Sequence, residues 1–184
     1  MHLITFQGST PRIDPTAFVA PGAQLIGDIE IGPEASIWYN CVLRGDVNRI
    51  RIGARTNIQD GSVVHVDSPK PGDEHGRPTI IGEDVLIGHL AMVHGCILHD
   101  RAFVGLGSIV MDGCVIESDA MLAAGAMLTP GKRIPSGQLW AGRPAKYARD
   151  LSPQELEGQQ MGVRHYVALA KAHSEALRSQ QAQP

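Results

Sequence analysis

The chain has 184 residues, of which 43% are hydrophobic, so it can bury a core in one domain but is too short for several. Its formal net charge of −3 is accompanied by no run of Lys or Arg, which argues against nucleic-acid and anionic-membrane binders. The sequence opens with no charged-then-apolar leader and contains no apolar stretch of membrane-spanning length. We therefore expect a cytoplasmic protein that binds small solutes, with no nucleic-acid or membrane partner.

An aliphatic residue, often followed by Gly, recurs every six residues from about residue 15 to about residue 130. This period does not match the helical repeat, but it suits short strands that end in Gly, Asp or Asn turns. Three such hexads make one triangular coil, and stacked coils bury the aliphatic residues as ladders with a rise of about 4.8 Å. An ordinary β-sandwich does not predict this period. The repeated aliphatic residues are Ile31, Ile37, Leu43, Ile52, Ile58, Val64, Ile81, Ile87, Val93, Leu98, Val104, Val110, Ile116, Leu122 and Leu128.

The fourth residue after each of these markers is usually small or β-branched, as the tight inner corner of a coil requires. The predicted inner-corner residues are Ala35, Cys41, Thr56, Ser62, Val85, Ala91, Ile97, Ser108 and Cys114. The three cysteines of the chain, which also include Cys96, are widely spaced and form no CxxC motif. Neither a disulfide framework nor a thiolate zinc site is expected, and we interpret the cysteines as small buried apolar residues.

Two interruptions of the period predict loops. Leu43 and Ile52 are nine residues apart, and Val64 and Ile81 are seventeen apart. The second interruption contains the polar, Pro- and Gly-rich stretch 67–78, which is typical of turns. Insertions in repeat proteins tend to lie on the functional face.

The C-terminal part is predicted to leave the repeat after Pro130 and to end in a helix. Ser152 and Glu155 form a capping-box pattern with Pro at the first helical position. We expect residues 1–150 to form the β-helix domain and residues 151–184 to form a helix that packs on it or on a neighbouring subunit. The apolar stripe of this helix comprises Leu156, Val163, Val167, Ala170 and Leu177.

Three histidines occupy related places in the repeat. His65 follows Val64 and His94 follows Val93, so the two are expected to stack on successive coils about 5 Å apart, close enough to share a metal ion. His89 lies on the preceding side of the triangle, five residues from His94, which in an extended chain is about 16 Å. Because zinc–nitrogen bonds are only about 2 Å long, one chain cannot easily bring all three histidines to one ion. A trimer in which neighbouring chains share the site removes this difficulty.

The residues around these histidines resemble a known family. Residues 44–46 (RGD), 57–65 (NIQDGSVVH) and 88–95 (GHLAMVHG) are similar to the R-x-D, N-x-Q-D-x-x-x-x-H and G-H-x4-H motifs of γ-class carbonic anhydrases, and the match covers almost the whole chain. The hexad pattern itself resembles that of the hexapeptide-repeat proteins. The resemblance implies an all-β solenoid, a left-handed parallel β-helix with a C-terminal α-helix.

The resemblance also implies a function, the zinc-dependent reversible hydration of carbon dioxide to bicarbonate by a homotrimer. In that family, three histidines bind zinc, or alternatively iron or cobalt, across the faces of the trimer. The residues that match them are His65, His89 and His94.

Five further residues match motif positions with implied roles. Gln59 would orient the hydroxide at the metal, and Asn57 would line the pocket and help to place carbon dioxide or bicarbonate. Arg44 and Asp46 would form an ion pair at the interface with a neighbouring subunit, and Asp60 would join that network.

The sequence departs from the fully active family pattern at two acidic positions. Val47 stands where an acid follows the R-x-D motif, and Ser68 stands where an acid lies beyond the first metal histidine. A proton shuttle needs only a suitable pKa and a water path, so other residues of the long loop can serve. The candidates are Asp67, Asp73, Glu74 and His75.

Two rival functions remain open. Residues 141–146 (AGRPAK) resemble the turn that closes the coils of hexapeptide acyltransferases, which use acyl-coenzyme A, a single catalytic histidine and no metal. The replacements Val47 and Ser68 favour a second rival, a non-catalytic trimeric scaffold that keeps its metal to hold the subunits together. Fold alone does not choose between them.

Overall fold

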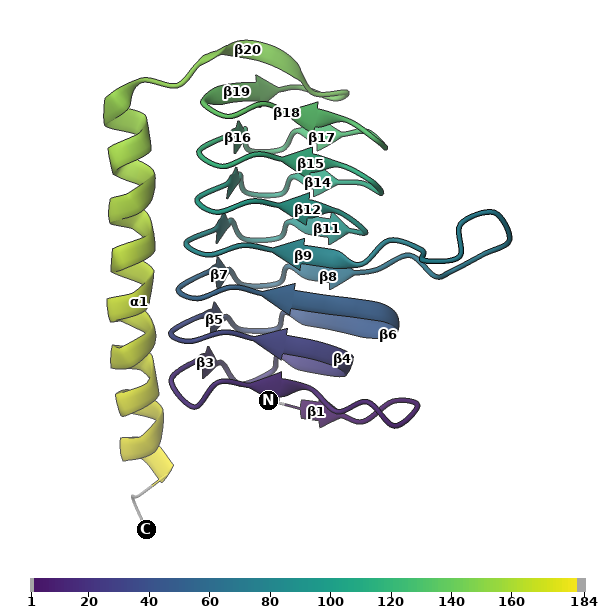
Figure 1. Cartoon of the computed structure of the whole chain (residues 1–184). Coiled ribbons are helices and arrows are strands. Elements are labelled where there is room, and N and C mark those ends of the chain that lie inside the picture. The colour runs from purple at the N-terminus through teal and green to yellow at the C-terminus, as the bar shows by residue number, and fades with distance from the viewer. Residues whose placement is uncertain (1, 182–184) are drawn as a thin grey trace.

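The computed structural model describes residues 2–181, so Met1 and the last three residues of the predicted 151–184 segment lie outside the described residues. Short parallel strands wind into stacked triangular coils, and one helix runs along them antiparallel to the direction in which the coils climb (Figure 1). The predicted left-handed parallel β-helix of hexapeptide repeats with a C-terminal helix is confirmed.

Face 1 of the triangle consists of short parallel strands, one from each coil, and is closed by an antiparallel strand at its C-terminal end. Its strands are β3 (Phe18–Val19), β5 (Ser36–Ile37), β7 (Asn57–Ile58), β10 (Leu86–Ile87), β13 (Phe103–Val104), β16 (Met121–Leu122), β19 (Gln138–Ala141) and the antiparallel β20 (Lys146–Asp150).

Faces 2 and 3 belong to one continuous sheet, because two long strands run from face 2 around a corner into face 3. These long strands are β4 (Gln24–Ile31) and β6 (Val42–Ile52). Face 2 also contains β1 (His2–Ile4), β8 (Val63–His65), β11 (Met92–His94), β14 (Ile109–Val110) and β17 (Met127–Leu128). Face 3 also contains β2 (Arg12–Ile13), β9 (Thr79–Ile81), β12 (Ile97–Leu98), β15 (Val115–Ile116) and β18 (Arg133–Ile134).

The interior is filled by the predicted aliphatic ladders. Leu43, Ile58, Val64 and Ile87 are fully buried, as are the corresponding residues of the other coils. Each buried Leu or Ile contributes roughly 1.5–3 kcal/mol through removal of its side chain from water. The three cysteines are also buried and free, as predicted, and burial raises the pKa of the Cys41 thiol to about 11.

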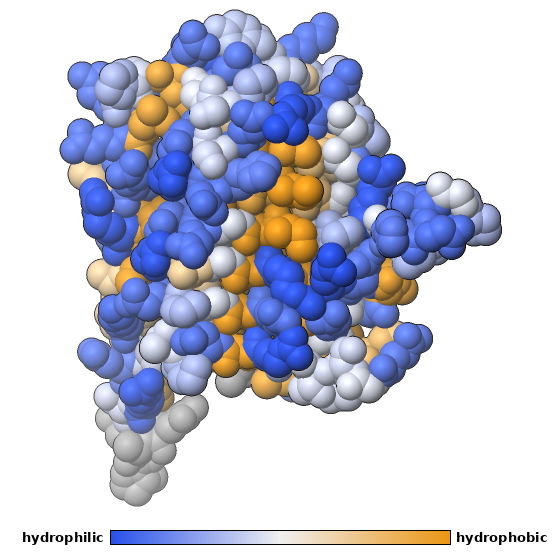
Figure 2. Space-filling view, in the orientation of Figure 1, coloured by the Kyte–Doolittle hydropathy of each residue, from blue (hydrophilic) through white to orange (hydrophobic). Residues whose placement is uncertain are grey.

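The inner-corner assignment of Ile97 is wrong. Val93 and Leu98 are five residues apart, so this turn is one residue shorter than the others, and Cys96 occupies the inner corner with 1% exposure. Gly95 allows the tighter turn because its φ is +51°. Ile97 instead points outward and is 39% exposed. Its partners on the adjacent strands are Ile80 and Val115. Figure 2 shows an apolar band over face 3.

The two interruptions of the period differ in structure. The first is not a loop, because β6 continues through it and pairs with β4 along most of its length. Residues 42–45 and 50–52 pair with β4, and residues 46–49 between them form an irregular bulge within the strand. The second interruption is the predicted loop, which projects from the coils between β8 and β9 (Figure 1) and carries two isolated bridges, Asp67 to Arg77 and Lys70 to Asp73.

The prediction that the repeat stops after Pro130 is also wrong. Ile134 is fully buried and Trp140 packs against the core, which continues the six-residue spacing from Leu128. Pro130 and Pro135 lie outside the strands, in positions where no ladder N–H is needed, and therefore do not end the coil.

Helix α1 (Pro153–Gln181) begins with the predicted capping box. The Glu155 amide lies 3.3 Å from Ser152 Oγ, and the Ser152 amide donates to Glu155 Oε2 at 2.9 Å. The helix packs on face 1, where Val163 and Ala170 are 4% exposed. Within the described residues, no helix combines the length and apolarity needed to cross a bilayer.

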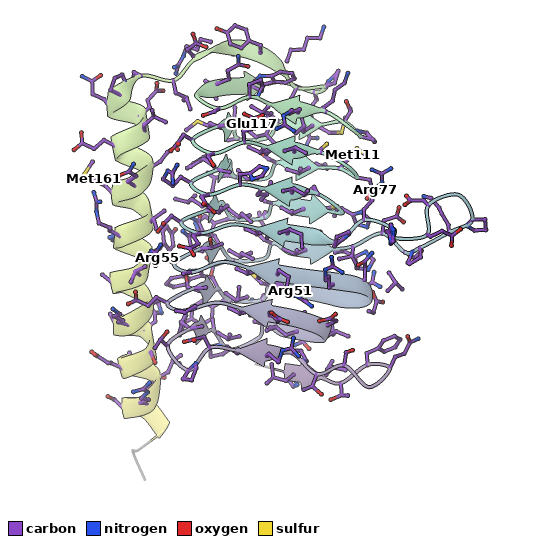
Figure 3. The ribbon with its side chains drawn as sticks, viewed as in Figure 1. Arg51, Arg55, Arg77, Met111, Glu117 and Met161 are labelled. Atoms are coloured by element: carbon purple, nitrogen blue, oxygen red, sulfur yellow. The ribbon has the colours of Figure 1, made fainter. Side chains whose placement is uncertain are left out.

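The corner between faces 3 and 1 carries an ion-pair ladder next to α1. Arg55 donates to both carboxylate oxygens of Asp84 at 2.7 and 2.8 Å, and Arg101 donates to both oxygens of Asp119 at 2.8 Å. Figure 3 places Arg55 beside α1 and Arg77 on the opposite edge of the molecule. We call these four residues, Arg55, Asp84, Arg101 and Asp119, the ion-pair ladder.

Candidate metal centre

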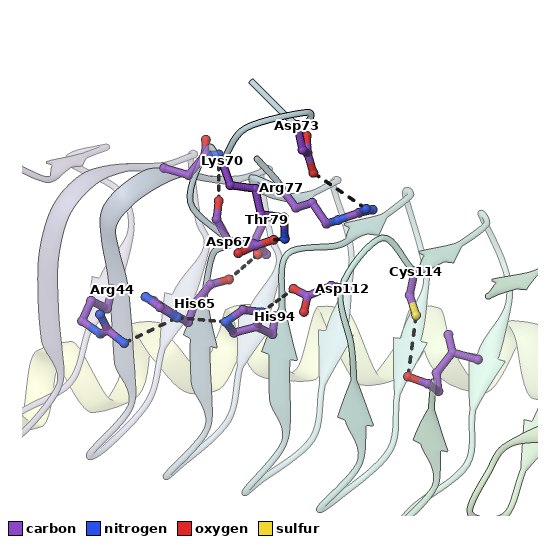
Figure 4. Close-up of polar contacts among 12 residues, drawn as sticks. Arg44, His65, Asp67, Lys70, Asp73, Arg77, Thr79, His94, Asp112 and Cys114 are labelled. Carbon is purple, nitrogen blue, oxygen red and sulfur yellow. Dashed lines mark hydrogen bonds and ion pairs between the residues drawn. The ribbon is translucent and has the colours of Figure 1, made fainter. Parts of the chain in front are cut away.

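His65 and His94 lie at the ends of β8 and β11 and are direct partners in the parallel ladder. The predicted stacking of the two histidines is confirmed, with ring centroids 4.9 Å apart. Nδ1 of His65 and Nε2 of His94 face each other at 3.0 Å (Figure 4). Arg44 stacks on the preceding coil, and its Nη2 lies 3.4 Å from the same His65 nitrogen.

In each ring, the nitrogen that faces away from the other histidine, here called the outer nitrogen, contacts a carboxylate. His65 Nε2 lies 3.0 Å from Asp46 Oδ1, and His94 Nδ1 lies 2.5 Å from Asp112 Oδ1. An ionised carboxylate only accepts hydrogen bonds, so each outer nitrogen carries the proton. Asp46 belongs to the coil before the histidine pair and Asp112 to the coil after it. The two histidines therefore lie between two carboxylates along the coil axis.

This arrangement leaves two lone pairs facing each other. In neutral imidazoles protonated on the Asp46 and Asp112 sides, His65 Nδ1 and His94 Nε2 are both acceptors. Two acceptors at 3.0 Å repel each other unless a cation or an added proton lies between or beside them. Two nitrogens on a tetrahedral zinc ion with bonds of 2.0–2.1 Å are about 3.3 Å apart, so the observed pair fits two ligands of one ion.

The protonation of this cluster favours metal binding. Burial lowers the pKa of His65, and the positive charge of Arg44 acts in the same direction, while the hydrogen bond to Asp46 opposes both. Burial opposes ionisation of Asp46, but hydrogen bonds from His65 and Arg44 outweigh it and hold the pKa of this carboxyl below its usual value. A neutral His65 and an ionised Asp46 are the forms that a metal ligand and its supporting acceptor require.

His89 lies apart from this pair. It lies at the corner between β10 and β11, where its Nδ1 is 2.8 Å from Asp60 Oδ2 and its side chain is 43% exposed. Its Nε2 is thus left as an acceptor, as are Nδ1 of His65 and Nε2 of His94. Within residues 2–181, no three His, Cys, Asp or Glu side chains of the one chain gather closely enough to hold a metal. The assignment of His65, His89 and His94 as ligands stays a prediction.

Asn57 and Gln59 lie on face 1, on and directly after β7, and not on face 2 with His65 and His94. Both side chains are buried, and Gln59 Nε2 donates to Asn57 Oδ1 at 3.1 Å. The Asn57 Nδ2 group is buried without an acceptor. A buried donor of this kind costs about 1–3 kcal/mol, so the pair is poised to donate to a further group. The catalytic roles of Asn57 and Gln59 stay predictions.

The network residues Arg44 and Asp46 form an ion pair within the chain. The implied contact of this pair with a neighbouring subunit stays a prediction, as does the participation of Asp60. Val47, in place of a family acid, is 43% exposed at the β6 extension. Ser68 is also exposed.

The shuttle candidates of the long loop divide into two groups. Asp67 pairs with Lys70 at 3.2 Å, and Asp73 lies 3.9 Å from Arg77. The hydrogen bond from Lys70 lowers the pKa of Asp67. Glu74 and His75 are exposed.

Asp112 was not singled out from the sequence. It belongs to no recognised motif, and it follows His94 by 18 residues, the length of one coil of three hexads. An acidic residue one coil after a histidine is the signal that could have identified it.

Several proteins of known sequence or structure are similar to this chain. Gamma carbonic anhydrase 2, mitochondrial, of Arabidopsis thaliana is 47% identical over 90% of this chain. Protein YrdA of Escherichia coli K12 is 43% identical over 85% of each chain. A crystal structure of a hexapeptide transferase family protein from Anaplasma phagocytophilum superposes with a TM-score of 0.86 at 49% identity, covering 92% of this chain and 96% of that one.

No protein-family profile matches the chain. The chain spans 59% of the Arabidopsis relative, so the activity of that whole protein does not transfer directly. The similarity to YrdA, however, extends over most of both chains, and the family motifs lie in the stacked positions described above. The chain therefore belongs to the γ-carbonic-anhydrase-like family of hexapeptide-repeat proteins.

Proposed function

We propose that this protein hydrates carbon dioxide reversibly to bicarbonate as a homotrimer, with zinc, or alternatively iron or cobalt, held between subunits. His65 and His94 of one chain and His89 of the partner subunit would be the ligands. The observation that carries the proposal is the pair of facing imidazole nitrogens, His65 Nδ1 and His94 Nε2, at 3.0 Å, a separation that suits two ligands of one ion. Membership of the family supports the same chemistry.

His65 and His94 of one chain and His89 of the partner subunit would hold the ion as neutral imidazoles, and the ion would supply the Lewis acidity that acidifies water near neutral pH. The residues of the chain prepare this site. Asp46 and Asp60 accept the outer protons of His65 and His89 and fix both rings. Gln59 would orient the reacting water, and the unpaired Asn57 Nδ2 would donate to bicarbonate or carbon dioxide.

The surface around His89 supports a shared site. Leu90, which directly follows His89, is 72% exposed, and Met92, at the start of β11, is 46% exposed. Leu106, at the same corner of the next coil, is 52% exposed. Clustered exposed apolar residues mark contact surfaces. A neighbouring chain docked there would bring its His65 and His94 toward His89.

Proton export would use the long loop. Glu74 and His75 are exposed on the long loop, whereas Asp67 is held by Lys70. We propose Glu74 or His75 as the shuttle that replaces the family acids at Val47 and Ser68. The cytoplasmic location stays a prediction, since the Arabidopsis relative is mitochondrial by name.

Subunit complementation tests the shared site. We expect His89→Ala and His94→Ala each to abolish metal binding. When the two variants are unfolded, mixed in equal amounts and refolded, every mixed trimer should contain one intact site, because one chain supplies His65 and His94 and the next supplies His89. Random assembly makes about three quarters of the trimers mixed, so about one quarter of the wild-type metal should return.

Two controls accompany this mixture. His75→Ala should keep full metal, and a mixture of His65→Ala with His94→Ala should stay metal-free because both remove the same half of the site. If the His89→Ala and His94→Ala mixture also stays metal-free while forming trimers, the shared site is contradicted.

Carbon dioxide hydration by stopped flow then separates the proposed function from its rivals. The zinc-loaded trimer should exceed the His94→Ala blank. A metal-loaded trimer without activity, which dissociates when the metal is chelated, would identify the scaffold instead. Acyl transfer is the third outcome, which acyl-coenzyme A binding in the absence of metal would reveal.

A further inference from the structure

Asp112 lies in the turn after β14 and reaches back to the preceding coil, where its Oδ1 meets His94 Nδ1 at 2.5 Å. The contact is partly exposed, with 32% of the His94 side chain and 36% of the Asp112 side chain accessible. Within the described residues, no cation forms an ion pair with Asp112 other than this histidine. The carboxylate therefore has the imidazole as its main partner (Figure 4).

The other two histidines show the same pairing. His65 has Asp46 on its outer nitrogen, and His89 has Asp60 on Nδ1. We propose that Asp112 is the positioning residue of the third ligand, fixing the Nδ1–H tautomer and the ring orientation of His94 so that Nε2 is presented to the metal. This inference rests on the proposed function and assigns a role to a residue outside the family motifs quoted above.

The physical reason lies in the two tautomers of a neutral imidazole. Without an acceptor at Nδ1, the proton can move to Nε2, and a protonated Nε2 cannot bind a metal. An ionised carboxylate at Nδ1 favours the productive tautomer and restricts rotation of the ring. Loss of such a partner typically weakens metal binding by about 10–100-fold.

The backbone leaves room for this contact at Gly95. A Cβ on Gly95 would lie 2.5 Å from Asp112 Oδ1, the same oxygen that meets His94, and 3.1 Å from Cβ of Arg77. Any larger residue at position 95 would have to displace the carboxylate. The geometry of the turn and the carboxylate contact are therefore coupled.

The first experiment measures zinc affinity by competition with a chelator of known affinity. Asp112→Ala should bind zinc about 10–100-fold more weakly than the wild type. Asp112→Asn should lose less, because its carbonyl oxygen still accepts from Nδ1–H. The control is Asp119→Ala, which removes a carboxylate that pairs with Arg101 in the ion-pair ladder and should keep wild-type affinity despite a loss of stability.

The second experiment needs no metal. Nitrogen-15 NMR of the metal-free protein should show His94 protonated on Nδ1 in the wild type and a mixture of both tautomers in Asp112→Ala. A general loosening of the fold would alter Asp119→Ala as well, whereas the tautomer shift should be confined to the Asp112 variants.

The third experiment leaves the three histidines and Asp112 in place. Gly95→Ala should weaken zinc binding by displacing the carboxylate. Gly131→Ala is a matched control, since Gly131 also has a positive φ (+70°) but a Cβ there meets no atom within 4 Å. Both substitutions carry the backbone strain, and only the first displaces Asp112.

Wild-type zinc affinity and an unchanged tautomer in Asp112→Ala would overturn the proposal. Failure of the proposed function gives a different result: the wild type would then bind no zinc, while the tautomer measurement on the metal-free protein would still decide whether Asp112 positions His94.

Discussion

The ion-pair ladder and the stack of His65 on His94 are two corner regions of the same solenoid in which polar residues stack from coil to coil, but their hydrogen bonding differs. In the ion-pair ladder, every guanidinium meets a carboxylate with two hydrogen bonds, as for Arg55 with Asp84 and Arg101 with Asp119. In the histidine stack, the carboxylates satisfy the outer nitrogens of His65 and His94, but the inner nitrogens face each other as two acceptors.

The difference indicates which region is complete in one chain. The ion-pair ladder needs nothing further and lies beside α1, so it is a structural element. In the histidine stack, the inner nitrogens have only each other and the Arg44 guanidinium, 3.4 Å from His65 Nδ1, as side-chain partners within the described residues. Buried or half-buried polar groups that the chain itself leaves unsatisfied are the groups to examine for function.

The largest expected effect is the loss of metal from the histidine stack. His94→Ala should lower zinc affinity by more than about 100-fold, since losing a ligand costs more than losing a supporting carboxylate. Metal content after dialysis, measured by mass spectrometry, checks this. Arg101→Ala in the ion-pair ladder is the control and should retain its zinc. Equal loss of metal in both variants would remove the distinction between the two regions.

The second effect concerns an exposed leucine near His89. Leu90 has a φ of +59° and is 72% exposed, a conformation and an exposure that both cost free energy in an isolated chain. Leu90→Asn should suit the backbone but remove apolar contact worth roughly 1.5–3 kcal/mol if a neighbouring subunit covers it. We expect the trimer to dissociate at least about tenfold more readily, measured by sedimentation equilibrium.

The control for this effect is Met161→Asn, which removes an apolar side chain that is 53% exposed on α1. It should leave trimer dissociation unchanged. If Leu90→Asn also leaves it unchanged, the corner near His89 is not the subunit contact.

The third effect sharpens the assignment of the ion-pair ladder as structural. Arg101→Ala should lower the unfolding free energy by about 1 kcal/mol, because the pair is partly exposed, with 39% of the Arg101 side chain accessible. For a chain of this size, the midpoint temperature of thermal unfolding should fall by about 2–4 °C. Thermal unfolding measures the shift, and the double variant Arg101→Ala with Asp119→Ala should lose little more than the single one. Fully additive losses would show that the two residues act independently.

The smallest effect is a pH dependence of the metal-free protein. The pKa of His65 is lower in the folded protein than its usual 6.5. As the pH falls, His65 therefore becomes protonated in the unfolded chain at a higher pH than in the folded protein. This part of the stability is present above pH 6.5 and is lost as the pH falls through the folded pKa, with a slope of at most about 1.4 kcal/mol per pH unit. Urea unfolding of wild type and His65→Gln over this range should show the slope only in the wild type. Parallel curves would contradict it.

Much of the fold and half of the candidate site were predictable from the sequence. The six-residue spacing predicts the buried ladders and the stacking of His65 on His94, because successive coils repeat the same register. The capping box predicts the start of α1. Two errors arose where the spacing changed: the five-residue step to Leu98 turned Ile97 outward, and the supposed first loop is a bulged part of β6, which pairs with β4 on both sides of it. The third arose at Pro130, where the spacing continues through Ile134.

The sequence by itself determined the coil, the register and the identity of the stacked histidines, since these follow from a local period. Only the tertiary structure decided which atoms of those histidines carry protons. That outcome depends on Asp46 and Asp112, which lie 19 and 18 residues from their histidines and on adjacent coils. Side-chain contacts along the coil axis depend on turn geometry, such as the room that Gly95 leaves, and the repeat pattern does not specify such details.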